Sequence, residues 1–298
     1  MSPDGAASTR RTVDGREITI SRPGKVLFPT DGFTKGQMID YYAAVADAML
    51  PHLVGRPLTM KRFPDGVDDE GFFEKHAPGH APTWVHHVEV PSAAGGIDYT
   101  VVDDRSTLVW AAGLATIEFH VPLWHVPPDG QVPGPPDHMV FDLDPGEGTG
   151  IVECCRVASR IAGILAGRGQ GSVPKTSGKK GLHVYAPLSG LSTWAGVRQR
   201  SHEIAVELEG ELPELVVSDM RRSLRPGRVL VDWRQNAPAR TTVAAYSLRA
   251  CPEPAVSTPV TWDEVERCGE AGDPLLLRFT PSQVLDRIER LGDLFAAV

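Results

Sequence analysis

The stretch MVFDLDPGEG, residues 139–148, decides the fold, because an apolar run there ends in two aspartates followed by proline and glycine. The pattern predicts a β-strand over residues 139–144. Successive side chains of a strand point to opposite faces, so Asp142 and Asp144 share one face near its end. Two carboxylates held that close repel each other unless a cation or a shared proton relieves them. The stretch therefore predicts a site for a hard divalent cation such as Mg²⁺ or Mn²⁺.

A D-x-D motif alone has other interpretations. A strand end with two solvated aspartates is one, and a sugar-nucleotide transferase that uses Mn²⁺ is another. A calcium-binding loop is a third, since Glu153 stands at the twelfth position counted from Asp142. That loop is excluded, because Gly146 stands where an oxygen ligand is needed and Glu147 takes the place of the required glycine. The first two interpretations stay open on this motif alone.

The second motif is KTSGKKGLHVY, residues 175–185. Its small residues let backbone N–H groups approach a ligand closely, and they are Ser177, Gly178 and Gly181. The side chains that add positive charge or donors are Lys175, Lys179, Lys180 and His183. We therefore expect a phosphate cradle, distinct from a Walker A loop because a strand and not a helix follows it. A solvated hairpin turn is the competing interpretation of this motif alone.

The third motif is RVLVDW, residues 228–233, in which Asp232 projects from an otherwise apolar strand. Taken singly, such an aspartate is most simply a structural hydrogen-bond acceptor. Together with Asp142, Asp144 and a phosphate cradle, it completes the donor set for two-metal phosphoryl chemistry. In that arrangement Asp142 and Asp144 bridge two metal ions, and Asp232 binds the ion that activates a hydroxyl.

The composition is that of an acidic globular protein with a substantial core. The 298 residues carry a formal charge of −8, and 41% are hydrophobic, which fits one large domain or two small ones. No run approaches the roughly 20 apolar residues of a membrane helix, and neither a signal peptide nor a zinc-binding cysteine spacing is present. We therefore expect a soluble cytoplasmic protein that makes no membrane contact and grips any polyanion through local basic patches.

The order of elements indicates a mixed α/β class around a central sheet. We expect helices at 34–50, 107–117, 151–167, 193–209 and 281–295. We expect strands at 57–63, 118–126, 139–144, 172–176, 182–188, 228–233 and 241–249, and a hairpin at 88–102. Thr34 is expected to cap the first helix and Pro51 to stop it. The Pro/Gly-rich connector at 126–137 is either a domain boundary or a surface loop.

Four motifs in fixed order, FDLDPGEG, TSGKKGLHVY, VLVDWRQN and AYSLR, resemble the polymerase domain of bacterial DNA ligase D, a branch of the archaeo-eukaryotic primase superfamily. The similarity runs from about Arg22 to Leu294, and GKVLFP, TKGQMIDYY, RPLTMKRFPDGV and FFEKHAP match the family's N-terminal half. These motifs displace the sugar-transferase interpretation. The resemblance implies an α/β primase-polymerase fold with central, mostly antiparallel sheets flanked by helices.

The resemblance also implies a domain organisation. Residues 1–21 are expected to form a flexible N-terminal segment, and residues 22–298 a single catalytic domain. Within it, residues 22–126 are expected to bind DNA ends and residues 138–298 to bind metal and nucleotide. Neither a nuclease nor a ligase module follows, so we expect a stand-alone polymerase chain.

The implied activity is that of a DNA-dependent nucleotidyltransferase. It extends the 3′ hydroxyl of a DNA primer with NTPs or dNTPs and releases pyrophosphate. Two Mn²⁺ or Mg²⁺ ions are expected at Asp142, Asp144 and Asp232. The expected work is the filling of short gaps at 5′-phosphorylated DNA, in end joining with Ku and a DNA ligase as partners, or in excision repair. De novo priming and non-catalytic binding of DNA ends are the alternatives.

The resemblance assigns further residues. The triphosphate is expected at His120, Ser177, Lys180, Arg225, Gln235 and Arg249. Either Phe72 or Phe73 is expected to stack on the base, with the other ring in the core. The 5′ phosphate of the DNA is expected at Lys25 and Lys35. The residues expected to extend the nucleotide and DNA surface are Lys61, Arg62, Lys179 and His183.

Overall fold

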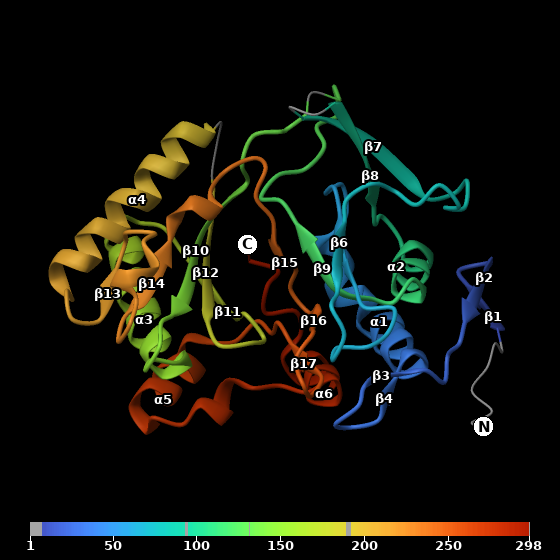
Figure 1. Ribbon diagram of the computed structural model, residues 1–298. Helices are drawn as coiled ribbons and strands as arrows, with labels where there is room; N and C mark the ends of the chain where they lie inside the picture. Colours follow the sequence, from blue (N-terminus) through green and yellow to red (C-terminus); the bar gives the residue numbers. More distant parts are fainter. Residues whose placement is uncertain (1–7, 93–94, 131, 189–191, 298) are drawn as a thin grey trace.

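Two main β-sheets stand side by side with helices around them in the computed structural model (Figure 1). The structure describes residues 8–92, 95–130, 132–188 and 192–297. A five-stranded sheet lies with α3, α4 and α5 on the left of the view, and a four-stranded sheet lies with α1 and α2 on the right. This mixed architecture of mostly antiparallel sheets confirms the expected fold class.

The five-stranded sheet carries the three motifs. Its order is β11 (Val173–Thr176), β12 (Leu182–Pro187), β10 (His138–Pro145), β14 (Val229–Asp232) and β13 (Val216–Val217). Its neighbours pair antiparallel, with the exception of β13 and β14. The helices α3 (Ile151–Gly167) and α4 (Trp194–Glu211) both pack against β10. The strand of the D-x-D motif is therefore central and firmly held.

The four-stranded sheet joins distant parts of the chain. Its order is β15 (Thr242–Val243), β9 (Thr116–Val121), β5 (Thr59–Arg62) and β6 (Phe72–Glu74), all antiparallel. The helices α1 (Lys35–Met49) and α2 (Arg105–Gly113) lie beside it and pack on each other. Because β15 comes from the C-terminal half, the chain returns late to complete a sheet that its N-terminal half begins.

The first helix begins and ends as the sequence predicts. The hydroxyl of Thr34 accepts from the backbone N–H of Gln37 at 3.2 Å, and the Gln37 side chain accepts from Thr34 N at 2.8 Å. This reciprocal pair is a capping box, which satisfies two backbone donors at the start of α1. The helix ends at Met49, just before Pro51.

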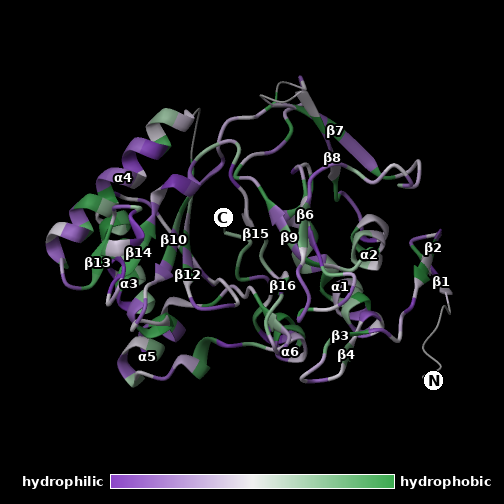
Figure 2. Cartoon of the chain, in the orientation of Figure 1, coloured by the Kyte–Doolittle hydropathy of each residue, from purple (hydrophilic) through white to green (hydrophobic). Residues whose placement is uncertain are grey.

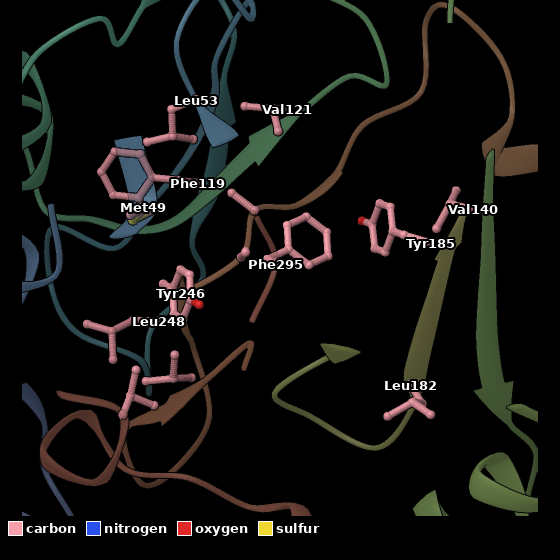
Figure 3. Close-up of a cluster of buried hydrophobic side chains, with 14 of the residues drawn as sticks. Met49, Leu53, Phe119, Val121, Val140, Leu182, Tyr185, Tyr246, Leu248 and Phe295 are labelled. Carbon is pink, nitrogen blue, oxygen red and sulfur yellow. The ribbon is translucent and has the colours of Figure 1, made fainter. Parts of the chain in front are cut away.

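Apolar side chains, several of them aromatic, lie between the two sheets (Figure 3). Tyr185 on β12 and Phe295 near the C-terminus meet edge to face, with ring centroids 5.0 Å apart. Tyr246 lies on the side of Phe295 away from Tyr185 in this view, and its hydroxyl donates to Asp293 at 2.5 Å. A direct link between the two sheets is the Tyr185 hydroxyl, which donates to Thr242 Oγ1 on β15 at 2.8 Å.

Shorter elements complete the chain. They are β3 (Val26–Phe28), β4 (Phe33–Thr34), β7 (His86–Ser92), β8 (Gly95–Val101), β16 (Leu248–Arg249), β17 (Ala255–Val256), α5 (Trp262–Ala271), α6 (Pro281–Leu291), η1 (Leu50–His52), η2 (Arg222–Leu224), η3 (Trp233–Gln235) and η4 (Pro274–Leu277). The strands β7 and β8 form the expected hairpin, which Figure 2 shows to be hydrophilic along β7. Its residues 93–94 lie outside the described residues. Of the helices in the described ranges, none combines the length and the apolar character that crossing a bilayer requires.

The N-terminal segment departs from the sequence prediction. Flexibility over residues 1–21 is wrong for residues 8–21, because β1 (Ser8–Val13) and β2 (Arg16–Ser21) form an antiparallel hairpin. Ile18 and Ile20 are 2% and 0% exposed, and β2 packs on α2. Exposed polar residues at alternate positions mask this pattern, since only one face of β2 is covered. Residues 1–7 lie outside the described residues.

The C-terminal quarter contains shorter and more numerous elements than the sequence predicts. The single strand expected at 241–249 is two short strands, β15 and β16, because Tyr246 between them has a φ of +66° that turns the chain. The helix α5 is absent from the sequence prediction. The last helix, α6, ends at Leu291 and not at residue 295, because Gly292 with a φ of +71° follows it.

Candidate metal and nucleotide site

Strand pairing brings two of the predicted aspartates face to face. The strands β10 and β14 pair antiparallel with Asp142 directly opposite Asp232, and with Asp144 opposite Leu230. Directly opposed side chains in such a pair project to the same face of the sheet. The three aspartates therefore share one face, although they belong to motifs far apart in the sequence.

Repulsion among these carboxylates appears in their pKa values. Removal from water, followed by the charges of Asp142 and Asp232, raises the pKa of Asp144 to about 7. Removal from water and the charge of Asp142 likewise raise the pKa of Asp232. Burial acts the same way on Asp142, but His183 and Lys175 outweigh it and hold its pKa below the ordinary value. A cation beside Asp144 and Asp232 would relieve this repulsion.

His183 links Asp142 to the other sheet. Its Nε2 lies 3.2 Å from Asp142 Oδ1, and its Nδ1 lies 3.2 Å from Lys175 Nζ. Lys175 is 0% exposed and donates to Ser257 Oγ at 2.5 Å and to Val243 O on β15 at 3.1 Å. The expectation that Lys175 faces a phosphate is therefore wrong. Its Nζ instead ties the strand of the phosphate cradle to the four-stranded sheet.

The donor chemistry of the aspartates fits a hard divalent cation, since Mg²⁺ and Mn²⁺ prefer carboxylate oxygens. Across the described residues, no group of three or more His, Cys, Asp or Glu side chains is placed so that it could hold a metal ion as it stands. Asp142 Oδ1 faces His183, and Asp232 Oδ1 accepts from the backbone N–H of Arg234 at 2.9 Å. The residues therefore fit a metal in type and in strand position, while two of the carboxylates are engaged by protein donors.

Ser177 shapes the turn between β11 and β12. Its Oγ accepts from the backbone N–H of Lys179 at 3.2 Å and from that of Gly181 at 3.1 Å. Lys179 and Lys180 at the tip are exposed. The hydroxyl of Ser177 thus orders the turn from within, and the turn presents two exposed lysines that could attract a phosphate.

Gly178 lets this turn approach the strands that follow. Its φ is +72°, and a Cβ there would stand 2.5 Å from Arg249 Cγ and 2.9 Å from Ser257 N. Both the backbone conformation and the space therefore require glycine. The close approach places Arg249 beside the cradle.

Glu118 is a central residue that the sequence analysis missed. It is 1% exposed, and its Oε2 accepts from His120 Nε2 at 2.9 Å. Its Oε1 lies 3.2 Å from Lys179 Nζ and 3.5 Å from Arg249 Nε, and accepts from Ala250 N at 3.0 Å. Burial opposes its ionisation, but these partners outweigh burial and hold the pKa of Glu118 well below the ordinary value. Apart from His120, its partners come from segments distant in the sequence, so no local pattern reveals it.

Both members of the phenylalanine pair are exposed, Phe72 by 44% and Phe73 by 59%. The expectation that one of them lies in the core is wrong, because β6 is an edge strand. Phe73 meets His120 edge to face at 5.6 Å, and Lys61 Nζ lies 5.2 Å from the Phe73 ring. The Phe72 ring instead lies 5.4 Å from the guanidinium of Arg62. Phe73 is therefore the ring that borders the cluster around His120.

Arg225 and Gln235 lie beside the aspartates. Gln235 Nε2 is 3.4 Å from Asp142 Oδ2, while its buried Oε1 has no hydrogen-bond partner in the described part of the chain. The buried Nε of Arg225 likewise lacks a partner there. The positive charge of Arg225 acts on both Asp144 and Asp232. These two side chains thus leave polar atoms to offer a ligand at the carboxylates.

A second basic cluster stands at the start of α1. The backbone N–H of Lys35 donates to Lys25 O at 2.8 Å, so the two lysines lie side by side. Lys35 is 6% exposed, and burial with the charges of Arg22, Arg62 and Lys25 lowers its pKa to about 8. Lys25 Nζ pairs with Asp65 at 2.5 Å. This crowding of positive charge would be relieved by a bound anion.

A family model described as the LigD primase-polymerase domain matches residues 34–295. The multifunctional non-homologous end joining DNA repair protein LigD of Mycobacterium tuberculosis is 42% identical over 294 residues, which is 97% of this chain and 37% of that protein. The bifunctional non-homologous end joining protein LigD of Bacillus subtilis is 32% identical over 269 residues, 90% of this chain and 42% of that protein. The chain thus spans well under half the length of these relatives.

The fold agrees with a solved structure. The polymerase domain of Mycobacterium tuberculosis ligase D in complex with DNA superposes with a TM-score of 0.88 at 42% identity, covering 94% of this chain and 97% of that chain. The sequence motifs, the order of the elements and the three-dimensional fold therefore agree. This chain belongs to the family of LigD primase-polymerase domains.

Proposed function

We propose that this chain is a DNA-dependent nucleotidyltransferase, which extends the 3′ hydroxyl of a DNA primer with NTPs or dNTPs. The observation that carries the proposal is the direct opposition of Asp142 and Asp232. Arg249, from the cationic group around Glu118, is close enough to act on the pKa of Asp142. Carboxylates that attract metal and cations that attract phosphate thus border one site. Membership of the family supports the same activity.

In the proposed reaction, the 3′ oxygen of the primer bonds to the α-phosphorus of the nucleotide. The bond from that phosphorus to the bridging oxygen breaks, pyrophosphate leaves, and the hydroxyl proton is lost to solvent. Asp142, Asp144 and Asp232 would hold two Mn²⁺ or Mg²⁺ ions, which when bound lower the pKa of the hydroxyl and offset phosphate charge. Positioning and charge stabilisation supply the acceleration.

The other side chains divide into two groups in this proposal. The triphosphate is held by His120, Ser177, Lys180, Arg225, Gln235 and Arg249. Phe73 stacks on the base, with Phe72, Lys61 and Arg62 along the neighbouring surface. Lys179 and His183 act indirectly, because each is paired with a site carboxylate, Glu118 and Asp142 respectively.

The basic cluster of Lys25 and Lys35 is proposed to bind the 5′ phosphate across a short gap. A focused pocket suffices for a terminal dianion even in a chain of net charge −8. The proposed setting is end joining at the nucleoid in the cytoplasm, with Ku and a DNA ligase as partners. We propose one catalytic domain, in which residues 22–126 read the DNA end and residues 138–298 carry the chemistry.

Primer extension on a one-nucleotide gap tests the proposal. With Mn²⁺ present, Asp142→Asn is expected to lose at least about a thousandfold in rate, because no neutral amide replaces a metal-binding carboxylate. Asp286→Asn, an exposed aspartate on α6, is the control and is expected to extend normally. Undiminished extension by Asp142→Asn contradicts the catalytic assignment. If synthesis is equally fast when no primer is supplied, de novo priming is favoured. If the protein binds DNA tightly but extends no primer, a role in binding DNA ends is favoured.

A further inference from the structure

A cavity of about 520 Å³ lies where α4 begins beside η3, separate from the site described above. Its walls include Trp194, Arg198 and His202 from α4 and Trp233 from η3. Of the described residues that line it, none is acidic. In a chain of net charge −8, this cavity combines indole rings with basic side chains and excludes carboxylates.

Backbone contacts fix both indole rings. Trp233 Nε1 donates to Ser218 O at 3.1 Å, and Trp194 Nε1 donates to Gly134 O at 3.0 Å. The polar atom of each ring is thereby satisfied, so a ligand would contact these rings through their apolar surface. A ring already held in place loses little freedom when a ligand stacks on it.

Flat and cationic groups already gather at the Trp233 ring. The His202 ring centroid lies 4.1 Å from it, with 39° between the planes. The guanidinium groups of Arg198 and Arg234 each lie 5.4 Å from the ring centroid. Aromatic faces beside arginines are the contacts by which proteins hold unpaired bases and their phosphates.

We propose that this cavity, the Trp194–Trp233 pocket, binds an unpaired nucleotide of the DNA substrate. The base stacks on the indole of Trp194, because His202, Arg198 and Arg234 already lie against the Trp233 ring, and the phosphate pairs with Arg198. The proposal rests on the proposed function, which makes DNA the substrate. The location supports this occupant, because Trp233 directly follows Asp232, so η3 connects the pocket to the strand that carries the proposed metal site. An unpaired strand is required, since a duplex hides its base faces.

Two neighbouring arginines of α4 provide a matched test. Arg198 lines the pocket, whereas Arg200 is exposed on the same helix but is not part of the lining. Binding of a fluorescent gapped DNA with an unpaired strand is measured by anisotropy over a range of salt concentrations. Arg198→Gln is expected to bind about tenfold more weakly and to reduce the salt slope by about 0.7, the value for one single-strand phosphate. Arg200→Gln is expected to stay within about twofold of the unchanged protein.

Equal losses in the two variants, or no loss in either, would overturn the proposal. A DNA carrying 5-iododeoxyuridine in its unpaired strand gives a second readout that does not depend on variants. Cross-links on Trp194 or Trp233 support the pocket, and cross-links exclusively elsewhere overturn it. Failure of the proposed function is distinguishable, because it would appear as extension by Asp142→Asn, whatever the two arginine variants do.

Discussion

Asp142 on β10 lies directly opposite Asp232 on β14, a pairing of like charges that ordinary antiparallel sheets avoid. The next pair along the same strands, Leu143 opposite Val231, is apolar and 0% exposed on both sides. The charged pair therefore interrupts a well-packed sheet. Burial first, and then the charge of Asp142, raises the pKa of Asp232. Such unfavourable charge placement in a fold is typical of functional sites.

Removing one of these charges is expected to stabilise the sheet and abolish the reaction. Without divalent cations, Asp232→Asn is expected to raise the thermal midpoint by about 1–3 °C, because opposed like charges cost a fraction of a kcal/mol or more. Mn²⁺ is expected to stabilise the unchanged protein and Asp286→Asn alike, but Asp232→Asn far less. Calorimetry with and without Mn²⁺ measures this. Full Mn²⁺ stabilisation of Asp232→Asn would show that the metal binds elsewhere.

The buried carboxylate of Glu118 is expected to supply the negative charge that a bound ligand would otherwise bring to Lys179 and Arg249. Glu118→Gln keeps an acceptor for Ala250 N but leaves the cations Lys179 and Arg249 without their counter-charge. Breaking a buried pair costs roughly 3 kcal/mol or more, so the midpoint is expected to fall by about 6 °C.

A triphosphate is expected to restore part of that loss, because it brings negative charge to the same cations. The shift in midpoint on adding a nucleoside triphosphate is therefore expected to be larger for Glu118→Gln than for the unchanged protein. An unchanged midpoint in the variant, or a smaller triphosphate shift, contradicts the assignment of this cluster to phosphate binding.

The cradle is expected to depend on Gly178 for space and not only for backbone freedom. Gly178→Ala meets Arg249 and the backbone of Ser257, whereas Gly169 has the same φ of +72° with nothing within 4 Å of an added Cβ. Both variants carry the strain of a positive φ, of about 1 kcal/mol, but only Gly178→Ala displaces Arg249. Nucleotide affinity, measured by titration calorimetry, is expected to fall at least about tenfold in Gly178→Ala and to be unchanged in Gly169→Ala.

The buried charge of Lys35 is expected to lower the stability of the fold and to bind the 5′ phosphate. Its pKa is lowered to about 8, first by burial and then by Arg22, Arg62 and Lys25. The unfolded chain holds this proton more tightly, so the charge costs stability below about pH 8, and the cost disappears as pH rises toward the ordinary lysine value. Lys35→Met also removes the hydrogen bond that Nζ donates to Ser21 O at 2.8 Å, so its midpoint relative to that of the unchanged protein is expected to be higher at pH 7 than above pH 10, by about 2 °C.

The same variant is expected to bind gapped DNA equally well with and without a 5′ phosphate, whereas the unchanged protein distinguishes the two. Arg11→Gln is a suitable control, because it removes an exposed pair with Asp40 on α1 outside the cluster. If Lys35→Met keeps the discrimination, the 5′ phosphate is bound elsewhere.

The candidate site was largely predictable where the information is local. Alternation along β10 places Asp142 and Asp144 on one face, and the fixed order of motifs anticipates that Asp232 comes to the same sheet. Thr34 likewise marks the start of α1 through residues only three positions away. In these cases strand period or capping chemistry acts within a few residues, so the sequence shows it directly.

The rest depends on contacts between distant residues. In the sequence, Glu118 looks like any other strand residue. Its role becomes visible only in the fold, where Lys179 and Arg249 lie against it. Lys175 reads as a phosphate ligand, because nothing near it in sequence shows that Ser257 and Val243 enclose its ammonium group. Ile18 and Ile20 are recognisable as core only once α2 covers one face of their hairpin.

The late arrival of β15 has a consequence for synthesis on the ribosome. Until Thr242 and Val243 emerge, β9 has no partner along one side, and its backbone at His120 and Val121 is an open template for another chain. One edge of β9 in the nascent polypeptide therefore stays unpaired while more than a hundred further residues are translated. Truncated products that stop before residue 242 are accordingly the species most prone to aggregate during expression.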